Sequence, residues 1–296
     1  LGLSASIQAV AAPTELKNKR TMYSKTFQNG TERMLRLSAV PIHYRTAKGD
    51  WQDIALDFKD YGNQELGYFH GIETNVFKSY FPTNLRSFPI FKTLDNAGFQ
   101  LSLENNAKSE AKITKKNDKD YLAGQARVTY FSGLSGADLA YEVKTMGFNQ
   151  MLTFNTRPKS EIVRFVINAS EFSPRNENGG IVFYRGGKPV WRAEQPVIYE
   201  ANNPKQAEIV SMRFTESSGK LYLVFTMDSR WLSDLKLSYP VTLASSILFV
   251  DSLLSYPEDL LLKISWDTKF TYWGSWQTSR TAWYNYQDGA LVIKDW

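Results

Sequence analysis

The chain has 296 residues, of which 43% are hydrophobic and 22% are charged, so it can bury the core of one large domain or of two ordinary ones. It contains no Cys, which excludes thiol catalysis, cysteine metal sites and disulfide bonds. Its net charge of +5 is scattered along the chain, and no apolar stretch approaches the ~20 residues of a membrane-spanning helix. The sequence therefore predicts neither a nucleic-acid partner nor a membrane span.

Residues 1–19 are expected to form an N-terminal extension, and their first nine residues alternate between apolar and small or polar types. This period of two predicts a strand. The alternatives are the remnant of a signal peptide, a short amphipathic helix, and a strand at an edge of the chain's own sheet. We expect the strand to pair with a sheet edge of a neighbouring subunit, as a donor strand. The residues of this assembly interface would be Leu1, Leu3, Ala5, Ile7 and Ala9.

Period-two patterns dominate the chain beyond the extension and predict antiparallel strands with one buried face. In the segment EIVRFVINA, residues 161–169, Val163, Phe165 and Ile167 share one parity and form an apolar face. Turn sequences such as Asn178-Gly179-Gly180 separate these runs, because Gly and Asn tolerate the positive φ that hairpin turns require.

The hydrophilic stretch 108–120 predicts a boundary between two β-rich domains, 20–110 and 111–243, or the tip of one long hairpin. An aromatic-rich segment, 244–296, follows. Within it, Pro257, Glu258 and Asp259 come early in residues 255–264 and predict the one short helix. The expected fold class is all-β, with antiparallel sandwich-like units and one short helix near the C-terminus.

Residues with catalytic or metal-binding chemistry form no recognisable motif. The two His residues, His43 and His70, lack the spacing of a zinc site, and neither a GxSxG nucleophile elbow nor a phosphate-binding glycine loop is present. Glycoside hydrolysis needs two carboxylates at a defined separation, and Asp53 and Asp228 belong to groups of carboxylates that could supply them. Sequence spacing does not give that separation. We expect His43 to be a hydrogen-bonded residue within a strand, and the chain to be no enzyme and to bind no metal or cofactor.

Six segments of the chain stand in a recognisable order: RTMYSKTF (20–27), PIHYRTAKGDWQDI (41–54), NVFKSYFP (75–82), DLAYEV (138–143), DSRWLSD (228–234) and YPVTL (239–243). Together they resemble the β-rich N-terminal region of large secreted bacterial surface proteins that continue into RHS/YD repeats or the domain type called DNRLRE. The resemblance implies an all-β structural module in an extracellular, cell-envelope or appendage setting, without a set of catalytic residues. The chain departs from that pattern at Ala244-Ser245-Ser246, where relatives tend to have Asp-Pro.

Aromatic residues are concentrated in the C-terminal segment, which holds five of the eight Trp residues. Trp and Tyr are enriched at protein interfaces, and on an exposed sheet their rings can also stack on sugars. The sequence therefore predicts packing or an interface with another subunit here, with a carbohydrate-binding surface as the alternative. The residues concerned are Trp266, Trp273, Trp276, Trp283 and Tyr284.

The function expected from these patterns is that of a secreted structural subunit of a cell-surface filament, sheath or appendage. Copies of the chain would join head to tail by strand exchange into a homopolymer, because contacts that do not close make fibres. A carbohydrate-binding adhesion module with a glycan partner is the alternative, and a glycan-acting hydrolase comes third. The expected location is extracellular or at the cell surface.

Overall fold

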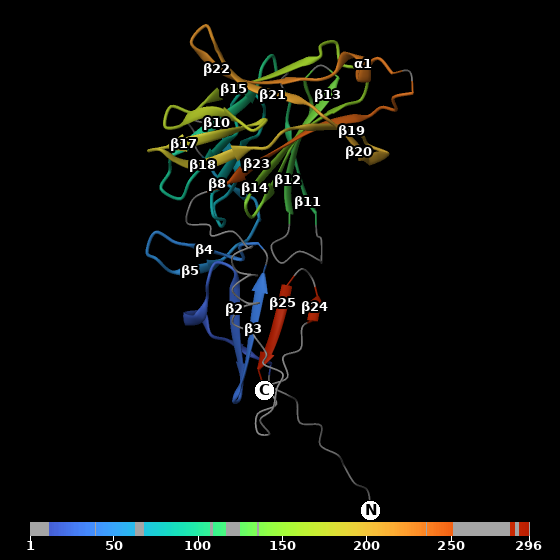
Figure 1. Ribbon diagram of the computed structural model, residues 1–296. Helices are drawn as coiled ribbons and strands as arrows, with labels where there is room; N and C mark the ends of the chain where they lie inside the picture. Colours follow the sequence, from blue (N-terminus) through green and yellow to red (C-terminus); the bar gives the residue numbers. More distant parts are fainter. Residues whose placement is uncertain are drawn as a thin grey trace, which may run out of the picture.

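The computed structural model has an all-β fold in which two antiparallel sheets face each other as a sandwich and a smaller sheet lies at one end of it (Figure 1). The all-β, sandwich-like class predicted from the sequence is confirmed. The structure describes residues 12–38, 40–62, 68–106, 109–116, 125–134, 136–234, 236–250, 285–287 and 290–295.

The first sheet of the sandwich has eight strands in the order β21-β22-β15-β10-β9-β8-β7-β6. On β15 the side chains alternate as the sequence predicts, because Val163, Phe165 and Ile167 are buried whereas Arg164 and Asn168 are exposed. The strands are β6 (Lys59–Asp60), β7 (Tyr68–Ile72), β8 (Lys78–Pro82), β9 (Ile90–Lys92), β10 (Gly98–Leu103), β15 (Ile162–Asn168), β21 (Ser211–Ser217) and β22 (Lys220–Thr226).

The second sheet has ten strands, and β23 is central to it because it pairs with β14 on one side and with both β18 and β19 on the other. Its strands are β11 (Ala111–Lys116), β12 (Gln125–Leu134), β13 (Ala137–Lys144), β14 (Gly147–Phe154), β16 (Ser173–Glu177), β17 (Gly180–Arg185), β18 (Lys188–Ala193), β19 (Val197–Glu200), β20 (Asn203–Ile209) and β23 (Val241–Phe249).

Hairpin turns occur where the turn sequences predict them. Asn178 and Gly179 take positive φ between β16 and β17, and Gly186 and Gly187 do so between β17 and β18. Two consecutive positive-φ residues match the twist of the flanking strands, which is why these turns favour Gly and Asn.

Aromatic side chains from both sheets meet in the core between them. Phe91 of the first sheet stacks on Phe148 of the second, with ring centroids 3.7 Å apart, and Phe99 stacks on Phe183 at 5.3 Å. Trp191 is fully buried and lies edge-on to Phe99 at 5.4 Å. The eight-stranded sheet combines strands from both sides of the boundary expected at residues 110 and 111, whereas the ten-stranded sheet uses only strands that follow it, and all contribute to one hydrophobic core.

A separate sheet of five strands lies at one end of the sandwich, in the order β1-β2-β3-β25-β24 (Figure 1). The hairpin β4–β5 joins it to the sandwich, since Tyr44, Ile54 and Leu56 belong to the sandwich core. The strands of this sheet are β1 (Thr14–Glu15), β2 (Ser24–Asn29), β3 (Glu32–Ser38), β24 (Asn285–Gln287) and β25 (Ala290–Asp295), and those of the hairpin are β4 (His43–Arg45) and β5 (Trp51–Asp53). A 3-10 helix spans Lys17–Lys19.

One short α-helix, α1 (Ser229–Leu232), lies at the end of the sandwich remote from the five-stranded sheet (Figure 1). The Asp228 side chain caps it by accepting a hydrogen bond from the Arg230 backbone N–H, and Leu232 is buried in the core. The helix predicted at 255–264 falls outside the described residues.

The stacked core predicts a large effect of truncating one ring. We expect Phe148→Ala to reduce the free energy of unfolding by about 3–5 kcal/mol, because it removes a buried ring and leaves a cavity between the sheets. Urea unfolding measures this loss. Phe131→Ala is the control, because that ring is 51% exposed and its loss should cost less than about 0.5 kcal/mol. Equal effects of the two substitutions would contradict the inter-sheet packing.

Candidate functional site

The site residues predicted from the sequence lie outside the described residues. This holds for the donor-strand residues Leu1, Leu3, Ala5, Ile7 and Ala9, and for the aromatic residues Trp266, Trp273, Trp276, Trp283 and Tyr284. Within the described portion, three places combine shape with polar chemistry: the five-stranded sheet, the ion-pair network beside it, and a pocket at the far end of the sandwich.

The five-stranded sheet is built from residues close to both ends of the described chain. β25 pairs antiparallel with β3 over six residues, from Ala290 opposite Ser38 to Asp295 opposite Arg33. On its other side β25 pairs only with the three-residue strand β24. Within the described residues, this hairpin is therefore attached to the sheet by the β3 ladder alone.

The register of β3 and β25 aligns residues of matching character. Leu35 stands opposite Ile293, and Leu37 stands opposite Leu291. Residues two apart on a strand share a face, so Leu35 and Leu37 of β3 fall on one side of the sheet, and their register partners on β25 are aliphatic residues. At the end of the ladder the positive Arg33 stands opposite the negative Asp295. The sequence of β25 is thus suited to the β3 edge in charge and in apolar pattern.

An ion-pair network ties strands β1 and β2 of this sheet to the β4–β5 hairpin. Arg20 donates from Nε to Glu15 Oε1 at 2.7 Å and from Nη2 to Asp53 Oδ2 at 3.0 Å, and Lys25 pairs with the same Asp53 carboxylate. The hydrogen bond from Arg20 lowers the pKa of Glu15. Burial acts against ionisation of Asp53, but Lys25 and Arg20 outweigh it and lower the pKa of that carboxyl too.

His43 lies fully buried beneath this network, which confirms the hydrogen-bonded residue within a strand expected at this position. Its Nδ1 donates to the Thr21 carbonyl oxygen at 2.6 Å, and its Nε2 lies 3.4 Å from Asp53 Oδ1. Burial lowers the pKa of the imidazole, aided by the charges of Arg20 and Lys25 and opposed by the Thr21 hydrogen bond and by Asp53. The ring is therefore neutral at pH 7 and serves the junction between β4 and the sheet.

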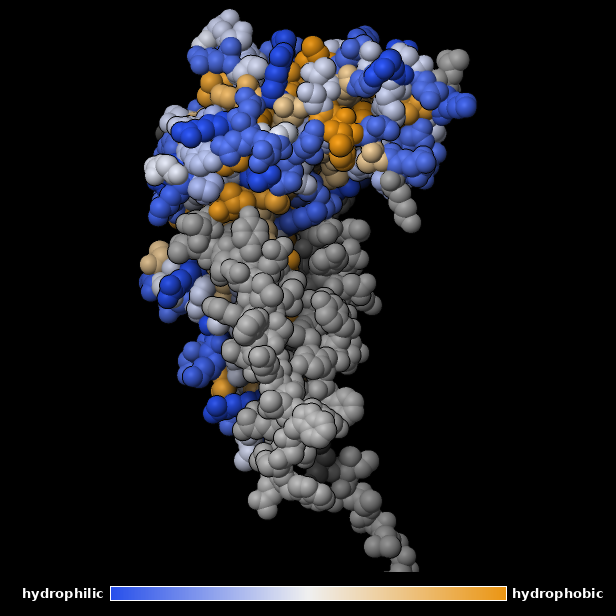
Figure 2. Space-filling model, in the orientation of Figure 1, coloured by the Kyte–Doolittle hydropathy of each residue, from blue (hydrophilic) through white to orange (hydrophobic). Residues whose placement is uncertain are grey.

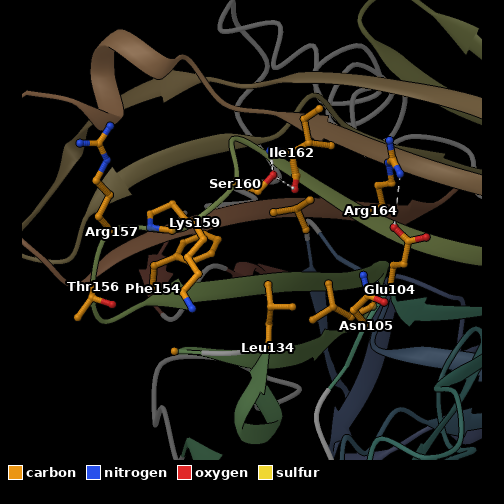
Figure 3. Close-up of a pocket in the computed structure, with 14 residues that line it drawn as sticks. Glu104, Asn105, Leu134, Phe154, Thr156, Arg157, Lys159, Ser160, Ile162 and Arg164 are labelled. Carbon is orange, nitrogen blue, oxygen red and sulfur yellow. Dashed lines mark hydrogen bonds and ion pairs between the residues drawn. The ribbon is translucent and has the colours of Figure 1, made fainter.

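The third place is a cavity of about 500 Å³ at the end of the sandwich that carries α1. Its floor is apolar and is made by residues of both sheets, including Leu103, Leu134, Phe154 and Val163. The loop between β14 and β15 forms its rim with Arg157 and Lys159 (Figure 3). This cavity was not predicted, because it exists only where two sheets separate at their ends.

The sandwich face visible in Figure 2 mixes hydrophilic and hydrophobic surface. The exposed large apolar residues come from separate elements and include Phe131, Ile162 and Ile209. Two of the carboxylates considered for hydrolysis have structural partners, since Asp53 holds Arg20 and Lys25, and Asp228 caps α1. Among the described residues, no three His, Asp or Glu side chains form a group suited to a metal ion.

No family model, curated protein or solved structure matches the chain, so its resemblance to secreted bacterial surface proteins stays a prediction. In the portion that the structure describes, every helix is too short to cross a bilayer.

The buried His43 predicts a pH dependence of stability. Its pKa is lowered in the folded state, so between the unfolded value of about 6.5 and the folded value the unfolded chain binds more protons. We therefore expect the free energy of unfolding to fall as the pH is lowered from 7.5 to 5.5. Glu15 and Asp53 add a similar loss only at more acidic pH, because their pKa values are also lowered.

Urea unfolding of the wild type and of His43→Asn at both pH values tests this prediction. The variant keeps an amide that can donate to Thr21, and it should lose less stability than the wild type over the same interval. The other histidine, His70, is present in both proteins and cancels in the comparison. An equal pH dependence in both would contradict the role given to His43.

Proposed function

We propose that the chain is a secreted structural subunit of a cell-surface filament, sheath or appendage, whose copies join by strand exchange. The observation that carries this proposal is β25, a strand near the end of the sequence that completes the sheet begun by β1, β2 and β3. Main-chain pairing of an added strand supplies affinity, and the pattern of side chains supplies specificity. The extracellular setting rests on the sequence resemblance.

The covalent connection is long enough for β25 to serve either its own copy or another. Residues 250–284 join β23 to β24, and 35 residues can span at most about 125 Å when fully extended. The entropic cost of closing a loop grows only slowly with its length. Pairing within one copy is therefore favoured over pairing between copies only because one chain holds the two strands close together. At high protein concentration the same ladder can form between copies, as in domain swapping.

The other sheet edges of the sandwich are less suited to this role. At the β16 edge, the Asn176 side chain accepts a hydrogen bond from the Phe214 backbone N–H of β21 at 2.8 Å and donates one to the Phe214 carbonyl oxygen. These two hydrogen bonds occupy the edge. On the opposite side, the Ala111 N–H of β11 donates to the Thr83 carbonyl oxygen at 2.7 Å. The free edge of β20 carries Pro204 and charged residues, which disfavour further pairing.

The contact between copies would use two different surfaces, because one copy supplies the strand β25 and the other copy supplies the β3 edge with which it pairs. Such a heterologous contact builds an open chain of copies unless it closes on itself. The N-terminal strand predicted over residues 1–9 stays a second candidate donor. The carbohydrate-binding alternative rests on the aromatic residues of the C-terminal segment and is an outcome of the test below.

Charge reversal at one register position distinguishes pairing between copies from pairing within one copy. Arg33→Asp and Asp295→Arg each place like charges opposite each other, and each variant alone should assemble several-fold more weakly than the wild type. An equal mixture should recover assembly, because every β25 then finds a complementary β3 on the other variant. Light scattering against concentration, with negative-stain images, measures this.

Arg213→Asp is the matched control, because this exposed Arg on β21 stands opposite Val224 and should leave assembly unchanged. A mixture that assembles no better than either variant alone would show that the β3–β25 ladder forms only within single copies. A wild-type protein that stays monomeric at all concentrations would refute the proposal, and glycan-array binding would then support the carbohydrate-binding alternative.

A further inference from the structure

The cavity at the α1 end of the sandwich has an apolar floor that continues into the hydrophobic core. Leu103 and Val163 come from the first sheet, and Leu134 and Phe154 come from the second. Leu103, Val163 and Phe154 are each less than 5% exposed. Leu134 and Ile162, which are more exposed, are the apolar lining side chains that a ligand would contact first.

The rim of the cavity carries an excess of positive charge. Arg157, Lys159 and Arg164 line it, and Glu104 is the single carboxylate among the lining residues. Arg164 is partly neutralised, since its Nη1 lies 3.7 Å from Glu104 Oε2. Arg157 points toward α1, where its Nη2 donates to Ser233 Oγ at 2.8 Å (Figure 3).

Lys159 is the cation best placed to meet a ligand. Its side chain extends from the β14–β15 loop toward Leu134 (Figure 3). No hydrogen bond or ion pair of its ammonium group is found within the described residues. An unpaired ammonium group above an apolar floor favours an anionic ligand group, which would form a charge-assisted hydrogen bond with it.

We propose that this cavity binds an aliphatic carboxylate, with the carboxylate at Lys159 and the hydrocarbon chain between the ends of the two sheets. A volume of about 500 Å³ lies within the range of small-ligand sites. Inorganic phosphate would leave the apolar floor without contact, and a sugar could pair with the polar rim but would place hydroxyl groups against Leu103, Leu134, Phe154 and Val163, which offer them no hydrogen bond. An aliphatic carboxylate matches both the floor and the rim.

The site lies at the opposite end of the molecule from the five-stranded sheet, so it is independent of the strand exchange proposed above (Figure 1). Its test does not depend on assembly. Glu104 supplies an internal check, because removing its charge frees Arg164 and should strengthen binding of a carboxylate.

Calorimetric titration with three ligands of equal chain length tests the proposal: decanoate, decanol and decyltrimethylammonium. We expect decanoate to bind about tenfold or more tightly than decanol, and the cationic ligand to bind most weakly. Lys159→Gln should remove most of the difference between decanoate and decanol, whereas Glu104→Gln should increase it. Lys188→Gln, at an exposed Lys that does not line the cavity, should leave all three affinities unchanged.

Circular dichroism of each variant confirms that the fold is retained. Filling the cavity by Leu134→Phe should weaken decanoate and decanol alike, which would show that the chain enters between the sheets. Equal affinities of decanoate and decanol for the wild type would overturn the role of Lys159. Absence of decanoate binding, or binding that Leu134→Phe leaves unchanged, would overturn the site.

Discussion

A strand in a sheet needs partners for its backbone N–H and C=O groups, and the arrangement of this chain depends on how β3 meets that requirement. β2 occupies one side of β3, and β25, more than 250 residues further along the chain, occupies the other. Without β25, the edge of β3, which carries Met34, Leu35 and Leu37 together with Arg33 and Arg36, would be unpaired, and an unpaired edge is a template for association. In the proposed function, the same constraint that completes the sheet would join copies.

The rest of the molecule fixes that edge in place. The stacked aromatic core makes the sandwich a rigid body, and the β4–β5 hairpin is anchored in it through Tyr44, Ile54 and Leu56. The network of Arg20 with Glu15 and Asp53 then connects the hairpin to the edge strand β1 of the five-stranded sheet. An exposed ion pair contributes little to stability. Here, however, the side chain of Arg20 is only 7% exposed and holds two carboxylates at once, which orients the sheet.

Much of the fold could be predicted from local patterns in the sequence. The alternation of residues 161–169 predicted β15 and its buried face, and the Asn-Gly and Gly-Gly sequences predicted the turns on either side of β17. The strand β25 was missed because Ala290–Ile293 is a short apolar run without alternation, and its partner is remote in the sequence. The Asp288-Gly289 pair between β24 and β25 was the available signal, since it is a typical hairpin sequence.

The candidate sites were harder to predict from the sequence than the strands were. Leu103, Leu134 and Lys159 are far apart in the chain, and they line one cavity only because the strands that carry or precede them end at the same end of the sandwich. Likewise, nothing near His43 in sequence indicates that Thr21 and Asp53 lie against its two ring nitrogens. Such sites follow from the packing of sheets and not from the period of any one strand.

The central claim is that β25 of one copy completes the sheet of another, and the absence of Cys permits a direct measurement. Leu35→Cys and Ile293→Cys in one chain place two thiols at opposed positions, where antiparallel strands approach closely enough for a disulfide bond. Oxidation of concentrated protein followed by non-reducing electrophoresis should give a ladder of covalently linked copies. Only internally linked monomers at every concentration, or no disulfide at all, would contradict the account.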